Sequence, residues 1–317
     1  MLENYLDRKS LKQEATRDGF GRGLVTAGED EKIVVLCGDL TESTRVNLFK
    51  EKYPERFIEC GVAEQNMMGI AAGLALSGRT AFVASYAVFN PGRNWEQLRL
   101  SVCYSEANVK IVGAHAGLSV GPDGATHQAM EDIAITRVLP NMTVICPCDS
   151  LEAEKATIAI ASHHGPTYLR LSRAPSPIFT TAKDEFVIGK AQVLAEGKDL
   201  TVVACGPLTY EVLVAADKIK DKLSVEVINC PTIKPMDKHT IVTSARKTGQ
   251  VITVEEHQIT GGLGGAVCEL LSEHHPTPVK RIGVNDRFGD TGEPMELWEA
   301  FGLSAEKLAG RFLEFVS

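Results

Sequence analysis

The sequence predicts an α/β protein made of two three-layer α/β domains, each built on a mostly parallel sheet. Short apolar, β-branched runs alternate with longer segments of helical periodicity, and this alternation is typical of parallel sheets covered by helices. A stretch rich in Pro, Thr and charge at 174–185 interrupts the pattern. With 317 residues, of which 44% are hydrophobic, the chain can form two ordinary cores. We therefore expect one domain at 1–180 and a second at 181–317.

In the first domain, five apolar runs predict strands and four longer periodic segments predict helices. The runs are short and rich in β-branched residues, which favours strands over buried helices. Strands are expected at 33–37, 80–86, 109–116, 142–146 and 167–171, and helices at 14–27, 64–77, 93–106 and 150–163.

The second domain repeats the alternation after the linker, with runs such as TVVAC. The first three runs are each followed by a segment long enough for a crossover helix. Strands are expected at 200–206, 224–230, 250–256 and 279–284, and helices at 208–221, 237–247 and 263–275.

Composition and charge exclude several function classes. The net charge is −8 and the pI is about 5.6, which argues against a nucleic-acid-binding surface, since such surfaces need clustered Lys and Arg. The N-terminus is charged and lacks a signal-peptide stretch, and no apolar run has membrane-spanning length. We expect a soluble, cytoplasmic protein that binds neither nucleic acid nor membrane.

The eight cysteines predict no metal site. Most lie inside apolar runs and are interpreted as small buried hydrophobes in a reducing compartment. The CPCD segment at 146–149 has CxC spacing, and no second Cys/His pair has the spacing of a zinc site.

Glu64 is the first candidate for a chemical role. It stands in GVAEQNMMGIAAGLAL (61–76), at the start of a helix with almost no polar face. Such a helix is usually buried on nearly all sides, so the carboxylate is expected out of bulk water, near the positive end of the helix dipole. Burial raises a carboxyl pKa, so the group is either paired or kept to exchange a proton. The alternative is a glutamate that only offsets the macrodipole.

Three ring-bearing residues are expected at one edge of the first sheet. Tyr86 and Phe89 follow the strand at 80–86, and His115 lies at the end of the strand at 109–116. Open α/β sheets bind their ligands at the carboxyl ends of the strands, where aromatic rings could stack on a flat heterocycle. Ordinary core packing is the alternative.

Acid–base and anion-binding candidates point to the same edge. The Gly/Pro-rich segment GPDGATHQ (121–128) predicts a loop, and its Asp123 and His127 are competent for proton transfer near neutral pH. Arg170 and Arg173 lie where the strand at 167–171 ends. They could clamp an anion such as a phosphate, or be ordinary surface arginines.

Taken together, these motifs resemble a known family. GVAEQ (61–65), the Tyr86–Phe89 segment, DGATHQ (123–128) and LSR (171–173), in this order and spacing, resemble the pyrimidine-binding domain of transketolase. EEHQITGGLGGAV (255–267) is similar to the family's C-terminal domain. The resemblance implies a thiamine diphosphate-dependent transferase of the pentose phosphate pathway, which moves a two-carbon ketol unit from a ketose phosphate to an aldose phosphate.

The resemblance also implies how the cofactor would be held. Glu64 matches the glutamate that hydrogen-bonds the pyrimidine N1′ and exchanges a proton with it. Phe89 and Tyr86 match the positions that stack on the aminopyrimidine, although the surroundings of Tyr86 are closer to those of deoxyxylulose-phosphate synthase. Asp39 matches an acidic residue near the cofactor.

For the substrate, the resemblance implies that His127 hydrogen-bonds the sugar oxygens and assists proton transfer. Asp123 would contact the C2 hydroxyl of the acceptor. The positions that hold the sugar phosphate are matched by Arg17, Ser43, His115 and Arg173.

One part of the family pattern is missing. Thiamine enzymes of this type bind the diphosphate through a divalent metal, held by a GDG segment with an Asn downstream, and GDL (38–40) is the nearest string. The chain therefore resembles the C-terminal subunit of a split transketolase. A separate N-terminal subunit would carry the diphosphate and the Mg²⁺ ligands, and two chains of each kind would form a heterotetramer.

Three alternatives stay open. A 2-oxoacid dehydrogenase E1 β-like subunit has the same layout, but that family generally lacks the DGATHQ loop. A 1-deoxyxylulose-5-phosphate synthase-like half has a THQ-like string, but usually Asp where this chain has His115. A non-catalytic scaffold paralogue would be expected to lose Glu64 or His127 first, and both are present.

Overall fold

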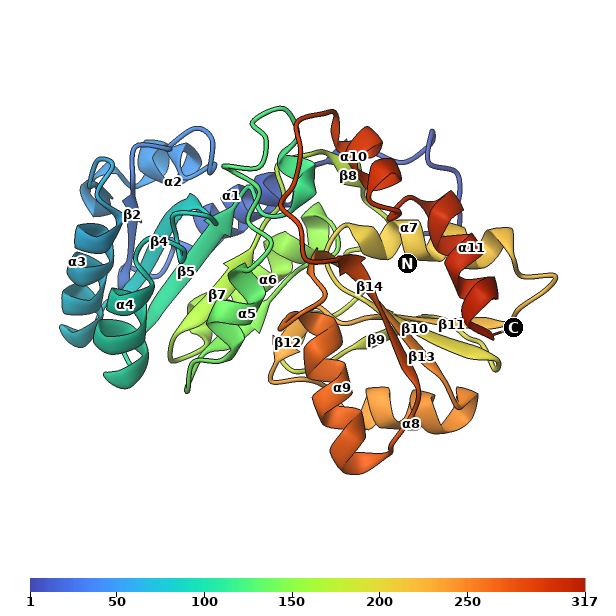
Figure 1. The fold of residues 1–317 in the computed structure, drawn as a ribbon. Coiled ribbons are helices and arrows are strands. Elements are labelled where there is room, and N and C mark those ends of the chain that lie inside the picture. The colour runs from blue at the N-terminus through green and yellow to red at the C-terminus, as the bar shows by residue number, and fades with distance from the viewer. Residues whose placement is uncertain (317) are drawn as a thin grey trace.

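A seven-stranded sheet forms the centre of the N-terminal half in the computed structural model, which describes residues 1–316 (Figure 1). The strand order is β12-β6-β7-β5-β4-β2-β3. All neighbours are parallel except β12, which runs antiparallel to β6. The strands are β2 (Ile33–Cys37), β3 (Phe57–Glu59), β4 (Thr80–Tyr86), β5 (Val109–Ala114), β6 (Thr143–Ile145), β7 (Thr167–Arg170) and β12 (Thr232–Lys234).

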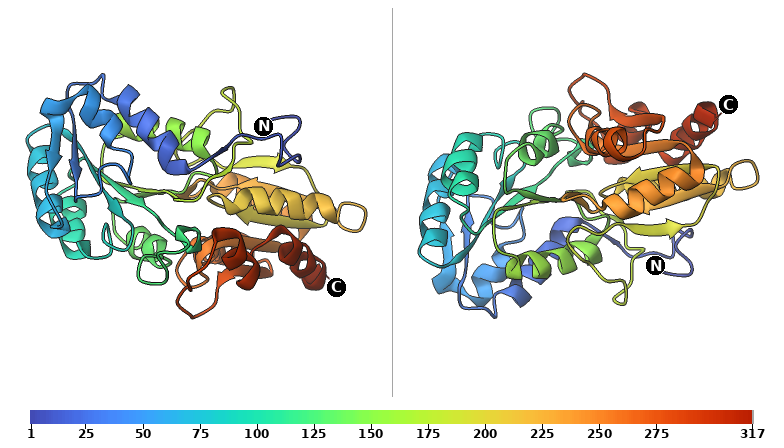
Figure 2. Two further views of the ribbon diagram at one scale, coloured as in Figure 1. Left: turned by 90° about the horizontal axis from the view of Figure 1, so that it is seen from above. Right: turned by 90° about the horizontal axis from the view of Figure 1, so that it is seen from below.

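Helices cover both faces of this sheet (Figure 2). Apolar side chains of α1, α2 and α6 form one buried layer with the strands, and those of α3 and η2 form the other. The α1–α6 contact is close because Gly19 and Gly23 carry no side chain: a Cβ there would meet main-chain atoms of α6 at 1.8 and 2.6 Å. The helices are α1 (Thr16–Ala27), α2 (Asn47–Lys52), α3 (Glu64–Leu76), α4 (Trp95–Gln97), the π-helix η2 (Leu98–Tyr104), α5 (Asp132–Arg137) and α6 (Ser150–Ser162).

The C-terminal half has a five-stranded sheet in the order β14-β13-β10-β11-β9. Only β9 is antiparallel to its neighbour. Helices α7 and α11 contribute to one core, and α8 and α9 to another that continues into the N-terminal half. The elements are β9 (Gln192–Ala195), β10 (Leu200–Ala204), α7 (Leu208–Lys218), β11 (Val225–Asn229), α8 (Lys238–Thr248), β13 (Val251–Gln258), α9 (Leu263–His274), β14 (Val279–Val284), α10 (Pro294–Ala300) and α11 (Ala305–Val316).

The predicted fold class is confirmed, and the departures from the predicted elements are local. The strand expected at 109–116 ends at Ala114, because His115 adopts a left-handed φ of 55°. The helix expected at 93–106 is a short α-helix that continues as the π-helix η2. The expected linker contains a strand, β8 (Ser176–Pro177), which pairs with β1 (Gln13–Glu14). The boundary near 180 stays a prediction.

A buried ion pair lies where the two halves meet. Arg170 donates to Asp132 over 2.8 Å and to the main-chain oxygen of Glu256 over 2.8 Å. Burial opposes ionisation of Asp132, but the charges of Arg170 and His257 and hydrogen bonds from Arg170 and Tyr168 lower its pKa. Arg170 is therefore a structural residue, and the prediction that it could clamp an external anion is wrong.

Two further observations concern predictions made from composition. Six of the eight cysteines are buried, and all eight are free thiols. No helix formed by residues 1–316 is both long and apolar enough to cross a bilayer.

Candidate active site

The carboxyl ends of β4 and β5 bring four aromatic and imidazole rings together at one sheet edge. Tyr86 stacks on His115 with ring centroids 3.8 Å apart. Phe89 lies nearly parallel to Tyr86, at 6.2 Å. His127 presents its edge to Tyr86 and Phe89, at 6.1 and 5.7 Å. All four were candidates from the sequence, and the fold places them in one cluster.

Two buried asparagines fix the turn that carries Phe89. The amide of Asn90 donates to two main-chain carbonyls of β4 and β5, at 3.0 and 3.1 Å. The amide of Asn94 donates to Asn90 Oδ1 and to the main-chain oxygen of Glu64. The turn after β4 and the start of α3 are therefore held together, and Phe89 and Glu64 share one supporting network.

Glu64 is the first residue of α3, and its side chain is only 2% exposed. The predicted burial is confirmed. Its carboxylate has a cationic partner, Arg93, whose Nη1 donates to Oε2 over 2.7 Å. The helix itself is less buried than predicted, because Ile70 and Leu76 on its outer face are 36% and 65% exposed.

Arg93 makes a second contact within the same cluster. Its guanidinium lies over the ring of Phe89, 4.6 Å from the centroid, while its side chain stays 47% exposed. One half-exposed cation thus contacts both the carboxylate of Glu64 and the ring face of Phe89, which the sequence predicts to stack on a heterocycle. Sequence reasoning missed Arg93, although it lies only four positions after Phe89.

Arg17, Ser43 and His115 meet beside the rings. Arg17 Nη1 donates to the main-chain oxygen of Ser43 over 2.8 Å and to His115 Nε2 over 3.1 Å. Because a guanidinium only donates, His115 Nε2 accepts and the ring proton lies on Nδ1. His115 is 1% exposed, and its Nδ1 has no hydrogen-bond partner among residues 1–316.

Electrostatics keep His115 neutral. Burial, and then the charges of Arg17, Arg173 and Arg45, lower its pKa to about 2. Burial and the neighbouring Arg45 also lower the pKa of Arg17. Three arginine charges lie near one neutral imidazole and repel one another. A bound anion would offset this repulsion, so the group favours anion binding.

The loop at 121–128 brings its two predicted residues to the same edge. Arg173 Nη1 donates to the main-chain oxygen of Val120 over 2.6 Å and lies 4.0 Å from Asp123 Oδ1. His127 Nδ1 is 2.9 Å from Thr126 Oγ1. Asp123 is exposed and His127 and Arg173 are half-buried, so all three side chains remain accessible to solvent at this edge.

Asp39 lies on a neighbouring loop, after β2. It is exposed, has a φ of 59°, and its amide donates to Glu59 Oε1 over 2.8 Å. The preceding Gly38 lies beside Glu64, since a Cβ on Gly38 would be 3.9 Å from Glu64 Cγ. Asp39 is near the start of α3, but among residues 1–316 no hydrogen bond or ion pair joins it to the ring cluster, and its role stays a prediction.

The described residues 1–316 include no group of three His, Cys, Asp or Glu side chains able to hold a metal ion. The site combines the aromatic rings of Tyr86 and Phe89, the buried carboxylate of Glu64 and the cationic group around Arg17. These features define a class of two-domain α/β proteins that bind a flat heterocycle and an anionic substrate at a sheet edge.

Comparison with known proteins narrows this class. Residues 12–177 match the family model "Transketolase, pyrimidine binding domain", and residues 189–308 match "Transketolase, C-terminal domain". The chain belongs to the transketolase family. The resemblance to the C-terminal subunit of a split transketolase is confirmed.

Several relatives are similar over nearly their whole length. A Methanocaldococcus jannaschii protein described as a transketolase C-terminal section is 44% identical over 303 residues, covering 94% of this chain and 95% of that protein. A 6-deoxy-6-sulfo-D-fructose transketolase subunit of Clostridium sp. is 42% identical, covering 89% and 88%.

Solved structures give the same result. A split-gene transketolase described as an inactive β4 tetramer superposes with a TM-score of 0.87 at 43% identity, covering 96% of this chain and 98% of that chain. The transketolase of Campylobacter jejuni has a TM-score of 0.81 at 25% identity, and this chain covers 47% of it.

Proposed function

We propose that this chain supplies the pyrimidine half-site of a two-chain transketolase. With a partner subunit and thiamine diphosphate, it would transfer a two-carbon ketol unit from a ketose phosphate to an aldose phosphate, reversibly. The observation that carries the proposal is the placement of buried Glu64 next to Phe89, at the sheet edge that also holds His127 and Arg17. Such a protein would act in the pentose phosphate pathway in the cytoplasm.

The side chains fit the aminopyrimidine ring. Glu64 offers a carboxyl group that is buried from solvent and can share a proton with a ring nitrogen. Phe89 and Tyr86 offer ring faces for stacking. When bound, thiamine diphosphate supplies the electron sink for the transferred unit, while these residues hold the pyrimidine and Glu64 holds or moves the proton at N1′.

The other end of the site fits a phosphorylated sugar. Arg17, Arg173 and the Nδ1–H of His115, which has no partner among residues 1–316, are donors for a phosphate, with Ser43 beside them. His127 would hydrogen-bond the sugar oxygens and move protons, and Asp123 would orient a hydroxyl of the acceptor. Guanidinium groups also donate to sulfonates, so the substrates named for relatives, a sulfofructose and apulose 4-phosphate, belong in the substrate test.

The partner would hold the diphosphate and Mg²⁺. Residues 1–316 include no group of three His, Cys, Asp or Glu side chains that could hold a metal ion, and a related split-gene transketolase is described as an inactive β4 tetramer. We propose an N-terminal transketolase subunit as this partner, with two copies of each chain in a heterotetramer.

The test mixes this chain with a candidate N-terminal subunit, thiamine diphosphate and Mg²⁺. Ketol transfer from xylulose 5-phosphate to ribose 5-phosphate is expected from the mixture and from neither chain alone. Tight cofactor binding by this chain alone, or a mixture without transfer that still assembles, would refute the half-site proposal.

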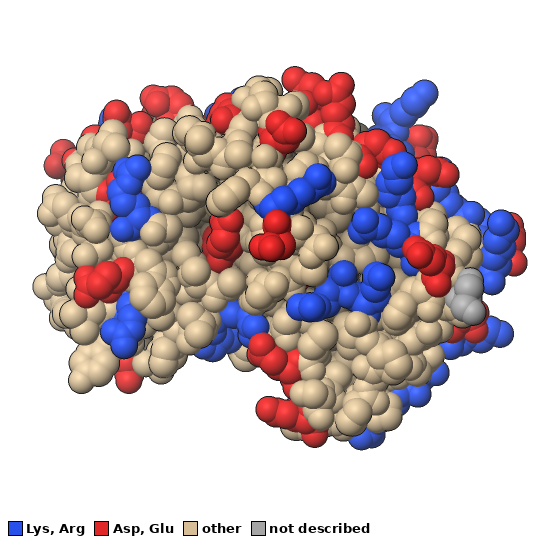
Figure 3. All heavy atoms as spheres, viewed as in Figure 1, with Lys and Arg blue, Asp and Glu red and all other residues tan. Residues whose placement is uncertain are grey.

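The outer face of α3 is the proposed docking surface for the partner. Gly69 and Gly73, about one turn apart, are exposed, and a Cβ at either would meet no atom within 4 Å. Exposed Ile70 and Leu76 flank them, and Figure 3 shows mostly uncharged atoms at the extreme left-hand rim, near α3, with an acidic and a basic patch just inside it. Two glycines on an apolar helix face permit close approach of another helix.

Replacing Gly73 by leucine is therefore expected to weaken partner binding by at least about tenfold. The chain itself should be no less stable, since the position is open and leucine is the better helix former. Partner affinity is measured by titration calorimetry. Gly310→Leu is the matched control, because Gly310 is an exposed glycine in α11 with equal free space. Equal affinities for the two variants would contradict the docking surface.

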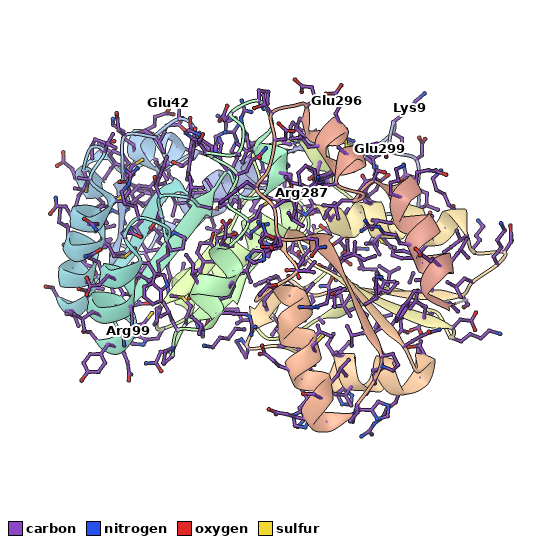
Figure 4. The ribbon with its side chains drawn as sticks, viewed as in Figure 1. Lys9, Glu42, Arg99, Arg287, Glu296 and Glu299 are labelled. Atoms are coloured by element: carbon purple, nitrogen blue, oxygen red, sulfur yellow. The ribbon has the colours of Figure 1, made fainter. Side chains whose placement is uncertain are left out.

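Replacing Arg93 by glutamine is expected to tighten thiamine diphosphate binding in the assembled protein by roughly three- to tenfold. The reason is that Arg93 donates to the Glu64 carboxylate and covers the ring face of Phe89. The aminopyrimidine must displace Arg93 from both contacts in order to bind. The apparent dissociation constant is measured by cofactor titration of the complex, with Arg99→Gln as a control for loss of one exposed charge (Figure 4). Weaker binding in Arg93→Gln would show that Arg93 assists the cofactor instead.

A further inference from the structure

A buried carboxylate of the C-terminal half holds the substrate loop of the N-terminal half. Glu256 lies in β13 and is 3% exposed. It accepts hydrogen bonds from the amide of Ser119, from Ser119 Oγ at 3.1 Å, and from Trp298 Nε1 at 2.9 Å. Ser119 lies in the short 3-10 helix η3 (Leu118–Val120), next to the loop at 121–128.

A second anchor holds the far end of the same loop. Gln128 Nε2 donates to the main-chain oxygen of Asp290 over 2.8 Å and to that of Leu118 over 3.3 Å. Asp290 lies in the segment between β14 and α10, between the labelled Arg287 and Glu296, which runs beside the loop (Figures 1 and 4). The C-terminal half therefore contacts the loop at Ser119 and at Gln128, on both sides of Asp123.

The loop needs outside support to keep one conformation. Its glycines Gly117, Gly121 and Gly124 have φ values of 82°, 80° and 75°, and glycine at positive φ leaves the free chain many conformations. Gly117 also lies directly against Glu256, since a Cβ there would meet the carboxyl carbon at 2.5 Å. The carboxylate of Glu256 therefore contacts the glycine-containing part of the loop, whose backbone would otherwise be the least restricted.

The supported loop in turn positions the anion-binding arginine. The main-chain oxygen of Val120, the residue after Ser119, accepts from Arg173 over 2.6 Å. Asp123 lies 4.0 Å from the same guanidinium. A shift of Ser119 would therefore move the acceptor that orients Arg173.

We propose that Glu256 is a positioning residue, through which the C-terminal domain fixes the 117–124 loop and sets the affinity of the site for the anionic end of the substrate. It touches neither substrate nor cofactor, and it acts through Ser119, Val120 and Arg173. The substrate part rests on the proposed function, whereas the loop part does not.

The neighbouring Glu255 provides a matched control. It is equally buried in β13, but it accepts from the amides of Leu263 and Gly264 at 2.7 and 2.8 Å, at the start of α9. Successive side chains of a strand point to opposite faces, so the two carboxylates share burial and charge but only Glu256 touches the loop. Aspartate at either position keeps the carboxyl group, but its side chain is one methylene shorter, so its oxygens lie farther from the hydrogen-bond donors.

The first experiment measures amide hydrogen exchange in the full chain without partner. In Glu256→Asp, exchange of the amides at 117–124 is expected to rise roughly tenfold over wild type. In Glu255→Asp it should be unchanged there, and faster at the start of α9. Equal exchange of the 117–124 segment in both variants would overturn the proposal.

Glu256→Gln tests whether the hydrogen bonds are the cause. Its amide oxygen can still accept from the Ser119 amide and from Trp298, which share Oε1, and Ser119 Oγ can accept instead of donate. Loop protection is therefore expected to lie near wild type. Protection as low as in Glu256→Asp would overturn the hydrogen-bond explanation.

The second experiment uses the assembled enzyme. In Glu256→Asp, the KM for a ketose phosphate is expected to rise roughly tenfold with a smaller change in kcat, while the KM for the same ketose without its phosphate stays within twofold. Glu255→Asp should leave both KM values unchanged. An equal rise for both sugars would overturn the substrate part. If wild type shows no transfer, the proposed function fails, and the exchange result still decides the loop part.

Discussion

Replacing Glu64 by glutamine is expected to lower the turnover of the assembled enzyme by about 10²–10⁴-fold, the range that a positioned proton-transfer group contributes. Glutamine keeps the size of the side chain and can still accept from Arg93, so the start of α3 should stay intact. What it loses is the ability to hold or release a proton at the pyrimidine nitrogen. The measurement is kcat for ketol transfer under saturating cofactor.

The control for this variant is assembly. Glu64→Gln should bind the partner subunit as wild type does, because Glu64 is buried and the proposed docking face lies at Gly69 and Gly73. Turnover within tenfold of wild type, in a complex that is fully assembled, would sink the proton-transfer role. Tyr86 and Phe89 would then form a binding site only, and another residue would carry out the proton transfer.

Replacing Asp132 by alanine is expected to lower the free energy of unfolding by about 3–5 kcal/mol, the cost of leaving a buried charge without its partner. Arg170 is 4% exposed and would keep only main-chain oxygens as acceptors. The pair joins β7 to α5, and the same guanidinium also donates to the main-chain oxygen of Glu256 in the C-terminal half. The loss should therefore affect both halves together. Urea denaturation followed by circular dichroism measures it.

Asp217→Ala is the contrasting variant. Asp217 pairs with Lys220 on the surface at 2.9 Å, and such pairs contribute about 0.2–1 kcal/mol. Asp132→Ala together with Arg170→Met should recover most of the stability, because the apolar pair leaves no unpaired charge. A double variant as unstable as Asp132→Ala would show that the lost charge pairing is not the cause.

The fold class could be predicted from sequence because the alternation of apolar runs and helical segments is a local pattern. The strand β12 could not be predicted, since it is three residues long and follows the C-terminal half's β11 in sequence but pairs with β6 of the N-terminal sheet. A short run of this kind has no periodicity, and only the long-range contact makes it a strand. The strand expected at 109–116 was also too long, because the left-handed φ of 55° at His115 ends the extended backbone and no local pattern predicts that φ.

The site was predictable where a residue type and its place at a strand end agree, as at Phe89, His115 and Arg173. It was not predictable where a contact joins distant residues. Arg93 follows Phe89 in sequence, but its bond to Glu64 appears only once α3 lies beside the turn. The apolar run of α3 also predicted burial on nearly all sides, since the outer face that we propose for docking has the same apolar composition as a core.

The strand β12 has a consequence for how the protein can be produced and divided. It covers the outer edge of β6, and an uncovered edge of a parallel sheet is a template for pairing with other chains. A fragment that stops near residue 180 would lose this cover and would be prone to aggregate. The two halves should therefore be expressed as one polypeptide, and any proteolytic study of the first half must keep residues 232–234 with it.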